Sequence, residues 1–203
     1  ALGLDAPVIC FQGAMVREVA GGKNTLFCEP VPAGPMHEVL ALAEERRLDL
    51  NVYGEDEFYF VDHGRPTSFY DRWFGMPMRR VNRLSEACEI LAARGKRPLK
   101  GLFIGDPDHN DALTPELAGR FGDRLTVVRS HSLFVEVSSL RASKGQALAF
   151  LADYYGIDRS ETLAVGDSGN DISMIEWAGV GVAMANGLPE VHQSAQWVAP
   201  PVA

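Results

Sequence analysis

The sequence predicts an α/β protein in which a parallel-sheet core carries an inserted α+β domain. Over residues 139–203, short apolar segments alternate regularly with amphipathic ones, which is typical of parallel strands joined by crossover helices. Over residues 19–138, strand-like segments come in pairs with helices between them, which is typical of a small antiparallel sheet. We therefore expect core segments at 1–18 and 139–203 and an inserted domain at 19–138.

The composition is that of an ordinary globular protein and excludes several classes of partner. Of the 203 residues, 46% are hydrophobic and 23% are charged. A formal net charge of −8 argues against a nucleic-acid partner, which would require a basic face. No apolar run approaches the ~18 residues of a membrane span, and no signal peptide is visible. The three cysteines lie far apart, so we expect reduced thiols in a cytoplasmic protein.

Apolar runs and turn residues predict the elements of the first two segments. A buried strand at 7–11 meets a turn at Gln12-Gly13, and a flexible break follows at Gly21-Gly22. Further strands are expected at 25–31, 50–53, 58–61, 99–104, 125–128 and 134–137, and helices from Pro35, over 85–93 and from Thr114, with Pro115 at its first position. Residues 62–83 are expected to be irregular, with at most one short helix.

The third segment has the clearest order of elements. Ser143 and Gln146 predict a capping box, and the helix that follows would bury Leu148, Leu151 and Tyr155. The later elements are expected as a strand at 163–165, a helix at 170–178, a strand at 181–183, a helix from Leu188 and a strand at 196–198. Because no polar residue alternates within 163–165, that strand is expected to be buried on both faces.

The stretch Gly166-Asp167-Ser168-Gly169-Asn170-Asp171 joins this strand to the next helix. Ligands of open α/β sheets bind at the carboxyl ends of strands, beside helix N-termini. Asp167 ends the strand and Asp171 begins the helix, so their carboxylates can converge on one hard cation. On these residues alone, a helix cap and a first-turn carboxylate that complements the helix dipole explain the pattern equally well.

Lys144 adds a second indication of a phosphate site. A lysine in the first turn of a helix opposes the helix dipole, which a bound phosphate would explain. For Lys144 alone, a solvated surface lysine is the favoured interpretation, and the residues that follow change this. Lys144-Gly145, Gly166–Asp171 and Gly181–Asn186 form an ordered series that resembles the haloacid dehalogenase superfamily, and within it the Cof-type (type IIB) phosphatases. Residues 2–14 are similar to the strand that precedes the cap in this family, although Asn is usual where Gln12 stands.

The resemblance implies a haloacid dehalogenase-like Rossmannoid core, incomplete in this sequence, with an inserted α+β (type IIB) cap. It also implies Mg²⁺-dependent phosphate-monoester hydrolysis, in which an aspartate nucleophile forms an aspartyl-phosphate and a second aspartate acts as acid and base. Carried onto this sequence, Lys144 pairs with phosphate oxygens, and Asp167 is a direct Mg²⁺ ligand. Asp171 is a second ligand or acts through a metal-bound water.

These implied roles give three sets of site residues. The catalytic set is Lys144, Asp167 and Asp171. The metal set is Asp167, Asp171 and Ser168. The substrate-binding set is Lys144, Asn170, Asn186 and Gln12.

The family's first motif, a strand ending Asp-x-Asp-Gly-Thr, is not found in this sequence. We expect it and the second motif upstream of Leu2, so that this chain is an N-terminally truncated fragment with little turnover alone. One internal alternative exists, because Asp106-Pro107-Asp108 follows an apolar strand and Ser130 ends another. No Gly-Thr follows Asp108, so a polar loop of the cap is the simpler interpretation.

The function expected from the resemblance is a Mg²⁺-dependent phosphatase for a small phosphorylated metabolite, such as a sugar phosphate or a cofactor phosphate. The alternative is a non-catalytic protein of the same fold that binds a phosphorylated metabolite or a partner. The sequence leaves the substrate and the oligomeric state open. Trp73, Phe74 and Tyr70 are candidates either for the substrate face of the cap or for packing beneath it.

Overall fold

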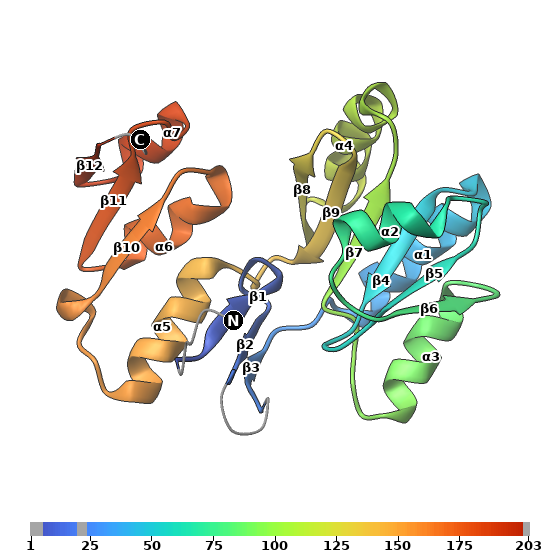
Figure 1. Cartoon of the computed structure of the whole chain (residues 1–203), viewed down its shortest axis with the longest axis horizontal. Coiled ribbons are helices and arrows are strands. Elements are labelled where there is room, and N and C mark those ends of the chain that lie inside the picture. Colours follow the sequence, from blue (N-terminus) through green and yellow to red (C-terminus); the bar gives the residue numbers. More distant parts are fainter. Residues whose placement is uncertain (1–5, 20–23, 201–203) are drawn as a thin grey trace. The chain divides into compact units, whose positions relative to one another are not determined.

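The structure, a computed structural model, describes residues 6–19 and 24–200 (Figure 1). The chain divides into two compact units, one of Ala1–Glu29 with Arg141–Ala203 and the other of Pro30–Leu140. In the described part of the chain, no helix has the length and apolar character that crossing a bilayer requires.

A three-stranded antiparallel sheet begins the first unit. β1 (Val8–Cys10), β2 (Met15–Arg17) and β3 (Thr25–Cys28) follow one another in this order across the sheet. β1 confirms the predicted strand, although its side chains are only half-buried. Because β3 pairs with β2, it belongs to the first unit, whereas the sequence expectation began the inserted domain at residue 19. The break expected at Gly21-Gly22 lies outside the described residues.

The rest of the first unit has the predicted parallel sheet. β10 (Leu163–Gly166), β11 (Val180–Met184) and β12 (Trp197–Ala199) are paired in parallel in this order. Their helices are α5 (Lys144–Tyr155), α6 (Ile172–Trp177) and α7 (Pro189–Ser194), seen with the strands in Figure 1. The predicted helix at 170–178 is divided into a 3₁₀ turn, η3 (Gly169–Asp171), and α6.

Two burial predictions in this unit are wrong. Leu163 and Val165 are 62% and 44% exposed, so β10 is covered on one face only, where α6 packs. On α5, Tyr155 is exposed, and the buried positions are small residues such as Ala147 and Ala152. These small residues allow α5 to approach α6 closely, and the predicted Leu148 and Leu151 are half-buried.

The second unit contains a six-stranded sheet in the order β6-β5-β4-β7-β9-β8. The strands are β4 (Asp49–Tyr53), β5 (Phe58–Val61), β6 (Met78–Val81), β7 (Lys100–Ile104), β8 (Leu125–His131) and β9 (Phe134–Ser139). Neighbouring strands are antiparallel except β5 and β6, which are parallel. β6 lies in the tract expected to be irregular; it is an edge strand with three exposed residues, so it lacks an apolar signal.

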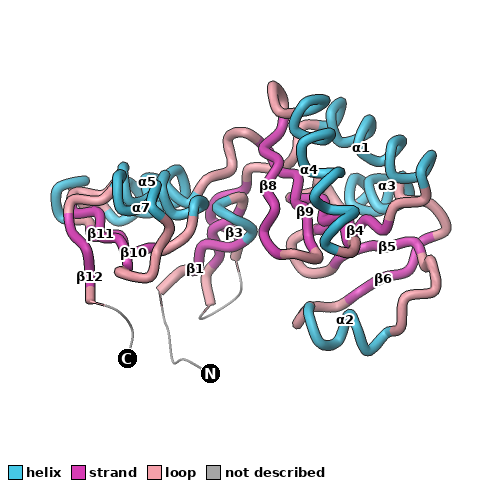
Figure 2. Tube along the Cα trace, turned by 90° about the horizontal axis from the view of Figure 1, so that it is seen from above, coloured by secondary structure: helices cyan, strands magenta, loops and turns pink. Residues whose placement is uncertain are grey.

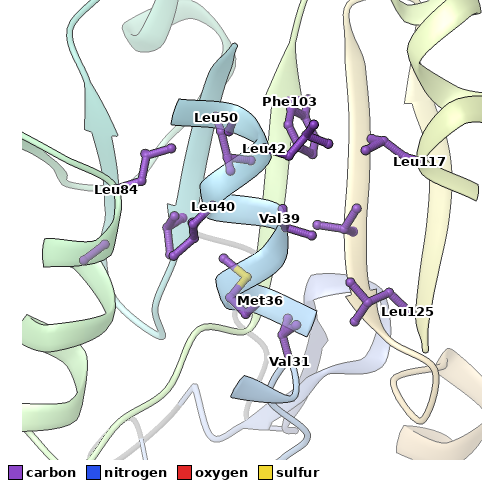
Figure 3. Packing of buried hydrophobic residues seen from close by; sticks show 14 of the residues in the cluster. Val31, Met36, Val39, Leu40, Leu42, Leu50, Leu84, Phe103, Leu117 and Leu125 are labelled. Carbon is purple, nitrogen blue, oxygen red and sulfur yellow. The ribbon is translucent and has the colours of Figure 1, made fainter. Parts of the chain in front are cut away.

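Helices cover both faces of this sheet. α1 (Ala33–Arg46), α3 (Ser85–Ala93) and α4 (Pro107–Phe121) lie on one face, and α2 (Thr67–Trp73) lies on the other (Figure 2). Leu40 and Val39 of α1 pack with Leu50 and Phe103 of the sheet in the main core (Figure 3). On the opposite face, the rings of α2 and Phe74 pack against sheet aromatics such as Phe58 and Phe134.

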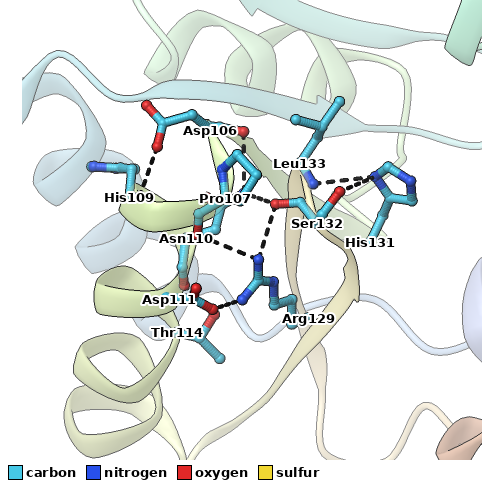
Figure 4. A network of polar contacts seen from close by, with 11 residues as sticks. Asp106, Pro107, His109, Asn110, Asp111, Thr114, Arg129, His131, Ser132 and Leu133 are labelled. Atoms are coloured by element: carbon cyan, nitrogen blue, oxygen red, sulfur yellow. Dashed lines mark hydrogen bonds and ion pairs between the residues drawn. The ribbon is translucent and has the colours of Figure 1, made fainter.

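The start of α4 corrects a prediction. The helix begins at Pro107 rather than after Thr114, because Asp106 is its N-cap and accepts a hydrogen bond from the His109 N–H at 2.8 Å (Figure 4). Pro115 lies inside the helix. The polar loop expected at 106–111 is therefore wrong: its acidic and amide residues form the first turns of a helix.

Candidate active site

The carboxylate of Asp171 connects the parts of the site. It is 4% exposed, and its Oδ1 accepts a hydrogen bond from Lys144 Nζ at 2.5 Å. Its Oδ2 accepts the backbone N–H groups of Asp167 and Ser168, each at 3.1 Å. One buried carboxylate thus joins the first turn of α5 to the loop that follows β10.

This environment keeps Asp171 ionised at neutral pH. Burial raises the pKa of Asp171, but the hydrogen bond from Lys144, the two backbone N–H groups and the lysine charge together hold that pKa below its ordinary value. The position of Lys144 in the first turn suggested a bound phosphate as the partner of its charge. Within the chain itself, that anion is Asp171.

Two glycines make these close approaches possible. A Cβ added at Gly166 would overlap the side chain of Asp171, and one at Gly145 would overlap the backbone carbonyl of Ser173. The Gly145 N–H also donates to Ser173 Oγ at 3.1 Å, which fixes the start of α5 against α6. The sequence analysis did not identify Ser173 as a residue of this region. The signal that could have identified it is its hydroxyl near the start of the predicted helix at 170–178.

Asp167 is exposed and is held from two sides. Its Oδ1 accepts a hydrogen bond from Ser168 Oγ at 3.1 Å. Its backbone carbonyl accepts the N–H of Leu188 at 2.9 Å, which connects it to the turn between β11 and α7. Exposed Asn186 lies in that turn. The structure therefore brings Asp167, Ser168 and Asp171 together with Lys144, and it places Asn186 on the neighbouring turn.

Gln12 reaches the site from a distant part of the sequence. Asn170 Nδ2 donates to Gln12 Oε1 at 2.5 Å. Phe11, Gln12 and Gly13 have φ values of 51°, 58° and 97°, so two non-glycine residues adopt the left-handed region that few side chains other than Asn and Asp favour. A Cβ at Gly13 would overlap the backbone of Ser143. This strained turn therefore packs against the residue before α5, and it places Gln12 within hydrogen-bonding distance of Asn170.

The oxygen donors fit Mg²⁺ as an ion held mainly by water and by a ligand's phosphate. Asp167 offers an exposed carboxylate, and Asn170 Oδ1 is buried without a hydrogen-bond partner among the described residues. Both carboxylate oxygens of Asp171 already accept hydrogen bonds within the chain. Across residues 6–19 and 24–200, no group of three or more His, Cys, Asp or Glu side chains could hold a metal. Mg²⁺ commonly takes one or two carboxylates and completes its octahedron with waters and phosphate oxygens.

Comparisons with known proteins show the family of the chain. Residues 1–203 match the family described as haloacid dehalogenase-like hydrolase. The chain is 37% identical over 192 residues to an HMP-PP phosphatase from Citrobacter koseri, a match that covers 94% of this chain and 67% of that protein. The chain spans 36%, 69% and 69% of the lengths of three other curated relatives.

Solved structures show the same fold. A haloacid dehalogenase-like hydrolase from Bacillus subtilis matches with a TM-score of 0.80 and 25% identity, over 98% of this chain and 76% of that one. A HAD subclass IIB sugar phosphatase matches with a TM-score of 0.68 and 19% identity, over 96% of this chain and 70% of that one. The second similarity concerns the fold alone.

Proposed function

The chain belongs to the haloacid dehalogenase-like hydrolases, and on that premise we propose that it carries the metal-holding and phosphate-holding half of a Mg²⁺-dependent phosphatase. The observation that supports this most directly is the convergence of Lys144, Asp167 and Asp171 at the carboxyl end of β10. The proposed substrate is a small phosphorylated metabolite, a class to which the substrate named for the Citrobacter relative belongs.

In this proposal each residue has a separate task. Asp171 holds Lys144 Nζ and the loop amides in place, and Lys144 offers its remaining N–H groups to phosphate oxygens. Asp167 supplies the direct carboxylate ligand, Ser168 orients it, and Asn170 Oδ1 is a further oxygen donor. Bound Mg²⁺ would supply charge neutralisation for the transferring phosphoryl group. Asp171, whose oxygens already accept hydrogen bonds, would act on bound Mg²⁺ through a water molecule.

The proposal places the nucleophilic aspartate, and the aspartate that serves as acid and base, upstream of Leu2. It places the protein in the cytoplasm, because Cys10, Cys28 and Cys88 form no disulfide within the described part of the chain. The proposed substrate-binding residues remain Lys144, Asn170, Asn186 and Gln12. Asn170 is oriented by its hydrogen bond to Gln12.

The test compares isosteric variants in a protein extended by the coding sequence that precedes Ala1. With p-nitrophenyl phosphate and Mg²⁺, Asp167→Asn should lower kcat/KM by at least about 100-fold, about 2.7 kcal/mol, because the carboxylate ligand is lost. Asp153→Asn, on the exposed part of α5, is the matched control and should change activity by less than about twofold. Turnover that persists in EDTA would contradict the proposal.

A non-catalytic phosphometabolite-binding protein is the second candidate. The ion pair between Lys144 and Asp171 favours it, because the charge of the lysine is already neutralised within the chain. The extended protein distinguishes the two candidates: saturable binding of a phosphorylated ligand with no release of inorganic phosphate would establish the second.

A further inference from the structure

A cavity of about 390 Å³ lies within the unit Pro30–Leu140, whereas the Lys144–Asp171 cluster belongs to the other unit. Its walls come from the start of α1, one side of α3 and the segment that leads into β7. None of its lining residues takes part in the proposed phosphatase machinery. The cavity therefore requires a separate explanation.

The cavity exists because small side chains face it from α3. Ser85, Cys88 and Ala92 line it at helical spacing, while Ala87 and Leu91 occupy the face of α3 that packs into the core. Val31 and Met36 at its base are buried, whereas Ala92 and Arg97 at its edge are exposed, so the cavity opens to solvent. Its volume is large enough for a small ligand.

The floor of the cavity is apolar and firmly held. Val31 and Met36 are each 1% exposed and belong to the main core of the unit, where Figure 3 shows them at the start of α1. The Val31 N–H donates to the Pro98 carbonyl at 2.8 Å, which fixes two walls to each other. A ligand entering the cavity would thus meet a preformed apolar surface.

The rim of the cavity carries charged side chains, and among the described residues Arg97 is the basic one without an ion pair. Lys96 Nζ lies 3.1 Å from an Asp56 carboxylate oxygen, and Glu89 pairs with Arg83 at 3.4 Å. Arg97 also lines the cavity and is exposed, and no acidic side chain among the described residues pairs with it. In a protein of net charge −8, an unpaired guanidinium beside an apolar hollow favours an anionic ligand with an apolar body.

We propose that this cavity binds a small apolar carboxylate. Its hydrocarbon part lies against Met36, Cys88 and Ala92, and its carboxylate meets the guanidinium of Arg97, which offers paired N–H donors. A saturated chain of about eight carbons fits the volume available. The site is independent of the proposed phosphatase function, and loss of one leaves the other intact.

Three probes that share one tail test the carboxylate preference: octanoate, octanol and octylammonium. Alkylation of Cys88 by iodoacetamide reports occupancy, with mass spectrometry of its peptide as the readout. Exposed Cys28, in the other unit, is the internal control. Burial raises the pKa of Cys88 to about 11, so the reaction is followed at pH 9. Saturating octanoate should slow alkylation of Cys88 at least fivefold and leave Cys28 unchanged.

The relative affinities of the three probes, and their change in two variants, test the proposal. Octanoate should bind at least ten times more tightly than octylammonium, and Arg97→Glu should reverse that order. Ala92→Trp should abolish protection by filling the cavity. Arg47→Glu is the matched control, because Arg47 is exposed in the same unit and does not line the cavity. It should bind octanoate as the parent protein does.

Three results would overturn the proposal. The first is equal protection by all three octyl compounds, which would indicate apolar adhesion without recognition of a carboxylate. The second is octanoate binding that survives both Arg97→Glu and Ala92→Trp. The third is self-association in sedimentation that Ala92→Trp removes, which would show that a second copy of the chain covers the cavity.

Discussion

Replacing Lys144 with Met should destabilise the first unit by leaving a buried carboxylate without its partner. Removing one side of a fully buried ion pair costs roughly 3–5 kcal/mol. The Lys144 side chain is 28% exposed and that of Asp171 is 6% exposed, so solvent screens part of the attraction. We therefore expect a loss of about 2 kcal/mol at pH 7. Asp171→Asn should cost less, about 1 kcal/mol, because the lysine it leaves behind can turn to water.

The loss of unfolding free energy caused by Lys144→Met should become smaller as the pH falls. In the parent protein the pKa of Asp171 is lower in the folded than in the unfolded state, so its ionisation stabilises the fold above the unfolded value of about 3.9. That stabilisation is lost as the pH falls through the folded-state pKa. Without Lys144, burial should dominate and raise the pKa of Asp171. The difference in unfolding free energy between the two proteins should therefore be largest at pH 7 and shrink in acid.

Urea unfolding of the parent protein and the two variants, at a series of pH values from 7 to 3, measures these differences. A Trp73→Phe background leaves Trp177 and Trp197, both in the first unit, as the fluorescent reporters, so unfolding of the two units is not mixed. A cost that stays constant between pH 7 and pH 3 would refute the reasoning. So would an Asp171→Asn variant that is less stable than Lys144→Met at pH 7.

Three further changes test other parts of the structure. Gly166→Ala should destabilise the first unit by about 1–3 kcal/mol in thermal unfolding, because the new methyl overlaps Asp171, whereas Gly169→Ala, which meets open space, should cost much less. Asp106→Ala should cost the second unit about 1 kcal/mol in urea unfolding if the residue caps α4, and nothing if it lies in a loop. Val165→Lys should reduce concentration-dependent light scattering without loss of stability, because Val165 lies on the uncovered face of β10; unchanged scattering would mean that this face does not drive association.

The order of helices and strands in residues 139–203 could be predicted because each element is marked by residues within or next to it. A capping serine precedes α5, Gly156 caps its end, and apolar residues mark β10 and β11. The parallel pairing follows from the alternation itself. The resemblance carried by Lys144 and Gly166–Asp171 supplied the family, which the comparisons confirm.

The errors arose where the signal depends on distant parts of the chain. The exposure of Val165 cannot be deduced from its own segment, because burial depends on what covers the second face of a sheet. The first turns of α4 are polar and lack apolar periodicity, so the cap at Asp106 resembled a loop. The contact between Gln12 and Asn170 joins residues 158 positions apart. It depends on the left-handed backbone angles of Phe11 and Gln12, which these residue types do not predict.

The two explanations first considered for Gly166–Asp171 prove to describe different residues of the stretch. Asp171 behaves as the helix-cap account requires, since it is buried and accepts backbone N–H groups at the start of a helix. The same carboxylate also accepts a hydrogen bond from Lys144, and in the proposed site it acts on the metal through water. Asp167 is thereby left exposed at the end of β10 with its carboxylate oriented by Ser168. In the proposed site the two aspartates therefore have different tasks: Asp171 fixes the loop and Lys144, and Asp167 offers its exposed carboxylate to the cation.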